Sequence, residues 1–79
     1  MKTIRSIIKS GRTYYSISDL ADALGSAIPN AKQMDGNPLI LKFNDDYYLT
    51  LDIQKPQLID FDKTLGALLA VPKTRKKYE

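Results

Sequence analysis

The stretch that decides most of this fold runs Leu39-Ile-Leu-Lys-Phe-Asn-Asp-Asp-Tyr-Tyr-Leu-Thr-Leu-Asp-Ile53. Apolar and polar side chains alternate along both of its halves, which is typical of two β-strands that each have one buried face. The polar run Asn44-Asp45-Asp46 between the halves predicts the turn of a β-hairpin. The side chains expected on the buried face are Leu39, Leu41, Phe43, Tyr47, Leu49, Leu51 and Ile53.

Shorter elements are expected before the hairpin. The run 13–17 is rich in β-forming residues and predicts a strand. Ser16, or alternatively Ser18, suits the N-cap of a helix that ends at Gly25, and Pro29 suits the first turn of a second short helix that extends to Met34. Residues 2–10 have isoleucines at helical spacing and predict a short helix, although the same isoleucines also suit a strand.

The last predicted element is an amphipathic helix that begins at Asp60 or Asp62. Its apolar residues recur at i, i+4, i+7 and i+8, and Pro72 prevents its continuation into the basic tail 73–79. The apolar stripe of this helix needs a surface to lie on, which is either its own domain or a partner. We predict that the stripe binds a partner protein or a second copy, and it consists of Phe61, Leu65, Leu68 and Leu69.

These elements predict a small α+β domain in the order helix, strand, helix, helix, hairpin, helix. Residues 1–59 form its compact part, a β-hairpin packed on short helices, and residues 60–79 form the C-terminal helix and basic tail. A chain of 79 residues buries only a small core, and it has no cysteine for a disulfide or a zinc site. The remaining routes to stability are an economical core, an oligomer or folding against a partner, and of the oligomers a homodimer is expected.

The composition favours binding over catalysis. The chain has no histidine and no cysteine, which removes the commonest general base and the commonest soft nucleophile. We therefore expect no enzymatic activity, no metal and no cofactor. No segment has the length of a membrane span or the apolar run of a signal peptide, so a cytoplasmic protein without a membrane partner is expected.

The net charge of +3 is unevenly distributed. Residues 1–12 and 63–79 are basic, whereas all eight aspartates lie between them, in residues 13–62. Basic ends suit a polyanion such as DNA, and the same pattern also suits simple solubility.

The run Leu20-Ala-Asp-Ala-Leu24-Gly25 resembles the first helix of helix-turn-helix DNA-binding proteins, in which a small residue lets two helices approach and a glycine forms the turn. The resemblance implies a winged helix, with the second helix in the major groove of DNA and the hairpin as the wing. An ordinary helical pair buried against a hairpin fits the same residues. The DNA contacts implied are Asn30, Lys32 and Gln33 towards bases and Arg5, Arg12 and Lys42 towards phosphates.

A second resemblance covers overlapping residues. Ser16-Ile-Ser-Asp19, the helix after it, and the run from Gly36-Asn-Pro38 to Leu51 resemble the N-terminal domain of prevent-host-death (Phd/YefM) antitoxins. That family has a strand, a helix and a Gly-Glu-Pro element before two apolar strands. Its members dimerise, bind operator DNA through the folded half and neutralise a toxin with a helical C-terminal tail. The extra N-terminal segment and the turn after Phe43, where the family has Arg-x-Gly, depart from this pattern.

We therefore expect a non-enzymatic, antitoxin-like DNA-binding regulator whose C-terminal helix binds a partner such as a toxin. The alternative is a small inhibitor or adaptor, of phage or mobile-element type, that binds a protein and not DNA. Its contacts would be the terminal helix and the tyrosines Tyr14 and Tyr48, because alternation sends one ring of each tyrosine pair outward. An outward ring can stack on a base, although more often it only shields the edge of a small sheet.

Overall fold

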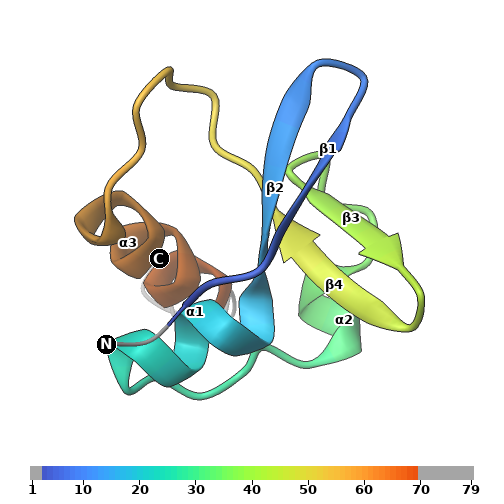
Figure 1. Ribbon diagram of the computed structural model, residues 1–79. Coiled ribbons are helices and arrows are strands. Elements are labelled where there is room, and N and C mark those ends of the chain that lie inside the picture. Colours follow the sequence, from blue (N-terminus) through green and yellow to red (C-terminus); the bar gives the residue numbers. More distant parts are fainter. Residues whose placement is uncertain (1–2, 70–79) are drawn as a thin grey trace, which may run out of the picture.

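Four antiparallel strands form one sheet in the order β1-β2-β4-β3 in the computed structural model, which describes residues 3–69 (Figure 1). In Figure 1 the helices α1 and α3 lie together on one side of the sheet, and the β1–β2 hairpin projects away from them. The predicted α+β class is confirmed. The elements are β1 (Ser6–Lys9), β2 (Arg12–Ser16), α1 (Ile17–Leu24), α2 (Ala31–Met34), β3 (Ile40–Phe43), β4 (Asp46–Leu49) and α3 (Leu58–Leu69).

The buried core lies between the helices and one face of the sheet, which we call the core face. All three helices contribute to it, and its buried side chains are Ile17, Leu20, Met34, Leu49, Phe61 and Leu65. Tyr15 of β2 meets the ring of Phe61 edge-on, with 5.2 Å between the ring centroids. The core therefore joins segments from both halves of the sequence.

The first element is a strand, so the prediction of a helix over residues 2–10 is wrong. β1 pairs with β2 from Ser6 opposite Tyr15 to Lys9 opposite Arg12. The two residues between the strands, Ser10 and Gly11, have φ values of 53° and 79°. A two-residue turn with positive φ at both positions matches the twist of a hairpin, and the adjacent β-branched isoleucines favour an extended strand. The observed order is therefore strand, strand, helix, helix, hairpin, helix.

Helix α1 begins after Ser16, the first of the two predicted caps, and ends at the predicted stop. Ser16 Oγ accepts a hydrogen bond from the backbone N–H of Asp19, and Gly25 closes the helix with a φ of 70°. Helix α2 is a single turn, and its N-cap is Asn30. Pro29 therefore precedes the cap, and the prediction that it opens the second helix is wrong.

The β3–β4 turn contains two residues rather than the predicted three. Asn44 and Asp45 have φ values of 52° and 64°, and Phe43 pairs directly with Asp46. A change of one residue in register moves side chains to the other face of a sheet. Leu41 and Phe43 consequently share a face with Tyr48 and lie opposite the core, so the predicted single buried face is wrong. The chain leaves the sheet after Leu49, and Ile53 is 50% exposed.

The Asp45→Gly variant is expected to be more stable than the wild type by about 0.5 kcal/mol, because glycine adopts positive φ without a steric cost and Asn-Gly is a preferred two-residue hairpin turn. The Asp45→Ala variant should be less stable than the wild type, since alanine keeps a Cβ and loses the side-chain polar group that eases this conformation. Urea unfolding monitored by circular dichroism measures both changes. An alanine variant more stable than the glycine variant would contradict the positive φ at this residue.

Helix α3 begins at Leu58, so neither predicted cap residue holds its first position. Asp60 lies in the first turn, where its carboxylate accepts a hydrogen bond from the backbone N–H of Gln57, and Asp62 lies further along the helix. The apolar stripe packs on the core of the same chain: Phe61 is 4% exposed, Leu65 is fully buried, and Leu68 packs against the cluster. The sequence alone allowed either placement of the stripe. The predicted stop at Pro72 and the basic tail lie outside the described residues.

A helix face buried in this way is not available to another protein unless the helix leaves the domain. Phe61 and Leu65 pack in the core of their own chain, and Leu69 in the same helix is half-buried. We therefore do not assign the stripe to a partner.

Candidate nucleic-acid interface

The β1–β2 hairpin ends in two cationic residues. Lys9 and Arg12 are opposite each other across the turn Ser10-Gly11, and both are exposed to solvent. We call residues 9–12 the hairpin tip. Arg12 is one of the predicted phosphate contacts; Lys9 is not among them, and the pairing of β1 with β2 brings it beside Arg12.

A groove of about 390 Å³ lies beside the hairpin tip, between β2 and the segment 50–56. The hydroxyl of Thr50 donates a hydrogen bond to the carbonyl of Thr13 at 2.8 Å and joins the two walls. Arg12 Nη2 lies 3.6 Å from Asp52 Oδ1, but the Asp52 side chain is 87% exposed. An ion pair so open to water contributes little to stability, and it leaves Arg12 free to exchange Asp52 for another anion.

The sheet face opposite the core carries aromatic and aliphatic side chains. The register places Ile7 beside Tyr14 and Leu41 beside Tyr48 on this face. Phe43 is 47% exposed and meets the ring of Tyr48 edge-on, with 6.4 Å between centroids. None of these side chains belongs to the core cluster. We call this set the outer sheet face, and it consists of Ile7, Tyr14, Leu41, Phe43 and Tyr48.

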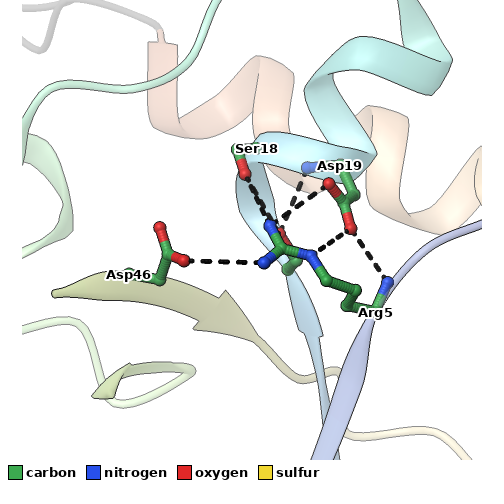
Figure 2. A network of polar contacts seen from close by, with 5 residues as sticks. Arg5, Ser18, Asp19 and Asp46 are labelled. Carbon is green, nitrogen blue, oxygen red and sulfur yellow. Dashed lines mark hydrogen bonds and ion pairs between the residues drawn. The ribbon is translucent and has the colours of Figure 1, made fainter. Parts of the chain in front are cut away.

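Arg5 is held by carboxylates of its own chain. Figure 2 shows its guanidinium between α1 and β4, with Nε 2.8 Å from Asp19 Oδ2 and Nη1 3.8 Å from Asp46 Oδ2. The backbone N–H of Arg5 donates to the same Asp19 oxygen, and Nη2 donates to Ser16 Oγ. The hydrogen bonds from Arg5 hold the pKa of Asp19 below its usual value, and those bonds and the charge of Asp19 raise the pKa of Arg5.

This network gives Arg5 a structural role, because it ties the segment before β1 to the start of α1 and to β4. A phosphate would have to displace Asp19 from three donors, the Arg5 backbone N–H, Nε and Nη2. We therefore do not include Arg5 among the proposed phosphate contacts.

Two of the three predicted base contacts form a capping box. Asn30 Oδ1 accepts from the backbone N–H of Gln33 at 2.9 Å, and Gln33 Oε1 accepts from the backbone N–H of Asn30 at 3.0 Å. Gln33 Nε2 also donates to the carbonyl of Leu68 near the end of α3. Lys32 remains exposed. A single-turn helix whose polar residues are bound in this way lacks the side chains that the base-contact interpretation required.

The remaining predicted phosphate contact, Lys42, lies on the other face of the sheet from Arg12. Its Nζ is 5.7 Å from the centre of the Tyr47 ring, and Tyr47 packs against the core cluster. The structure therefore brings Arg12 together with Lys9 at the hairpin tip, and it places Arg5 and Lys42 elsewhere.

Comparisons with known protein families, with curated proteins and with solved structures found no match. Within residues 3–69, no three or more histidines, cysteines, aspartates or glutamates are grouped so that they could hold a metal ion. In the same part of the chain, no helix combines the length and apolar character that crossing a bilayer requires. Function is therefore inferred from the hairpin tip and the surfaces beside it.

Proposed function

We propose that this protein is a non-enzymatic, antitoxin-like regulator that binds DNA through the hairpin tip. The observation that carries the proposal is the pair of exposed cations, Lys9 and Arg12, at the end of a hairpin that projects from the helices (Figure 1). Two adjacent cations on a projecting β-ribbon suit neighbouring phosphates, and β-ribbons are among the elements that enter DNA grooves.

The order of elements also supports the antitoxin-like proposal. From β2 onward the chain has a strand, a helix, a short turn of helix and two strands around a polar turn. Apart from the single-turn helix α2, this is the order implied by the resemblance to prevent-host-death antitoxins. The winged-helix interpretation gains less support. Residues Ser6–Lys9 form a strand where that interpretation has a helix before the helix-turn-helix pair, and α2 has only four residues.

The double variant Lys9→Ala, Arg12→Ala is expected to bind duplex DNA more weakly and with a smaller dependence on salt. The slope of log K against log salt should decrease by about 0.9 for each phosphate that the variant no longer neutralises. Gel shifts over a series of salt concentrations measure the slope. Lys63→Ala is the matched control, since it removes an exposed cation from α3 and should leave the slope unchanged.

A third variant tests the availability of Arg12. Asp52→Asn removes the carboxylate 3.6 Å from the Arg12 guanidinium and should strengthen DNA binding, because no protein anion then competes with phosphate. Wild-type binding that does not change with salt, or a double variant that binds like the wild type, would remove the proposal.

A second candidate function is a protein-binding inhibitor or adaptor. The observation in its favour is the exposure of three large apolar side chains in the segment before α3 and at the start of that helix: Ile53, Leu58 and Ile59 are 50%, 46% and 64% exposed. Exposed apolar side chains supply the contacts of many protein interfaces. Recovery of one stoichiometric protein without nucleic acid by the wild type, and its loss in an Ile59→Lys variant, would favour this function over DNA binding.

A further inference from the structure

We infer that the hairpin tip and the outer sheet face together bind single-stranded nucleic acid more tightly than a duplex, because unpaired bases can stack on the outer sheet face. The inference rests on the proposed function, because the cations of the hairpin tip would supply the phosphate contacts in both. It adds a class of ligand, unpaired nucleic acid, and a set of stacking residues that lie outside the hairpin tip.

The geometry begins with the alternation of side chains along the hairpin. Residues two positions apart in a strand share a face, so Lys9 and Arg12 lie on the same face as Ile7 and Tyr14. The pairing of Ser16 with Tyr48 carries this face across from β2 to β4. The outer sheet face is thus cationic at the hairpin tip and aromatic further along the sheet.

Two observations on the second hairpin extend the surface. Phe43 is 47% exposed, and its ring rests edge-on against Tyr48, which is only 7% exposed and supports it. Asp46 lies on the same face and would repel phosphate, and Arg5, 3.8 Å away, offsets its charge only in part because it is also paired with Asp19. The phosphates of a bound strand are therefore expected at the hairpin tip, and the aromatic part of the face would contact bases.

The chemistry of this surface suits unpaired bases. Single strands present the flat faces of their bases to aromatic side chains, whereas a duplex keeps those faces stacked inside the helix. Stacking works with every base, and cations beside the aromatic rings hold the backbone of the same strand. The cations of the hairpin tip and the rings of Tyr14 and Phe43 supply these two parts on one face.

The test measures by fluorescence anisotropy how tightly the full-length chain binds two labelled ligands. One is an oligothymidine of about 12 nucleotides, and the other is an A·T duplex of the same length. We expect tighter binding of the single strand. Tyr14→Leu and Phe43→Leu should each weaken it roughly ten-fold, because each removes one stacking ring. Tyr14→Phe and Phe43→Tyr keep an aromatic ring and should bind like the wild type.

A direct readout accompanies the affinities. The chain has five tyrosines and no tryptophan, so its intrinsic fluorescence comes from tyrosine and should be quenched when bases stack on it. Circular dichroism of each leucine variant checks that it is folded. Because Phe43 is exposed, its substitution leaves the core intact and keeps the test decisive if the Tyr14 variant fails to fold.

Leucine variants that bind the single strand like the wild type would overturn the stacking inference. If duplex binding still depended on Lys9 and Arg12 in that case, the proposed function would stand. A wild-type protein that bound neither oligonucleotide would overturn both. Ring substitutions that released a co-purified protein and left oligonucleotide binding unchanged would identify the outer sheet face as a protein interface, and the inference would again fail.

Discussion

Replacement of Leu65 by alanine is expected to lower the free energy of unfolding by about 2–5 kcal/mol. Leu65 is fully buried, and it belongs to the core cluster with Leu20 of α1, Leu49 of β4 and Phe61. Alanine would remove apolar contacts to both layers and leave a cavity where the helix meets the sheet. A domain of this length has a total stability of about 4–12 kcal/mol, so the variant should unfold at much lower urea concentrations.

Leu58→Ala is the matched control, because it makes the same substitution in the same helix at a side chain that is 46% exposed. Its effect should stay within about 0.5 kcal/mol, as for most surface substitutions. Equal unfolding midpoints for the two variants would mean that α3 does not pack on the sheet in solution. The stripe that contains Leu65 would then be free for a partner, as the sequence alone allowed.

The Asp19→Asn variant is expected to lose at most about 1 kcal/mol at neutral pH, because the pair with Arg5 is open to water, and to show a weaker loss of stability in acid than the wild type. The Arg5 hydrogen bonds lower the pKa of Asp19 in the folded state. A carboxylate of this kind contributes its full stability above its unfolded pKa of about 3.9, and the contribution is lost as the pH falls through the lower folded value. Asparagine has no charge to lose, so this part of the acid dependence should disappear.

The measurement is the free energy of unfolding in urea at several pH values from neutral to strongly acidic. Because other aspartates titrate in the same range, the informative quantity is the difference between wild type and variant. Asp62→Asn removes an exposed carboxylate from α3 and serves as the control, with a profile parallel to that of the wild type. A difference between Asp19→Asn and wild type that stayed constant with pH would show that Arg5 and Asp19 are not paired in solution.

Local signals in the sequence were sufficient where one short segment determines the structure. The cap at Ser16, the apolar face of α1 and the stop at Gly25 act within one stretch of chain, and the structure agrees with all three. The strand assignments for β3 and β4 also follow from a local pattern of alternation. The helix over residues 2–10 failed because Ile4, Ile7 and Ile8 satisfy both periodicities, and only pairing with β2 decides between them.

The candidate site depended on features that the sequence does not reveal locally. A turn of two residues instead of three moved Leu41 and Phe43 to the outer sheet face. Arg5 donates a hydrogen bond to Asp19, fourteen residues away, and Gln33 donates one to the carbonyl of Leu68, thirty-five residues away. These partners come together only after the chain folds, so residue type alone could not separate a free cation from a paired one.

The connection of the β1–β2 hairpin to the remaining strands is short, since β2 pairs with β4 only at Tyr15 and Ser16. The hairpin tip lies beyond this connection and makes no contribution to the core cluster. Substitutions at such separated positions add independently in free energy. If Lys9 and Arg12 form the proposed binding site, substitutions there can change what the site binds with little change in the stability of the fold, and an engineer could graft new loop sequences at this end without redesigning the interior.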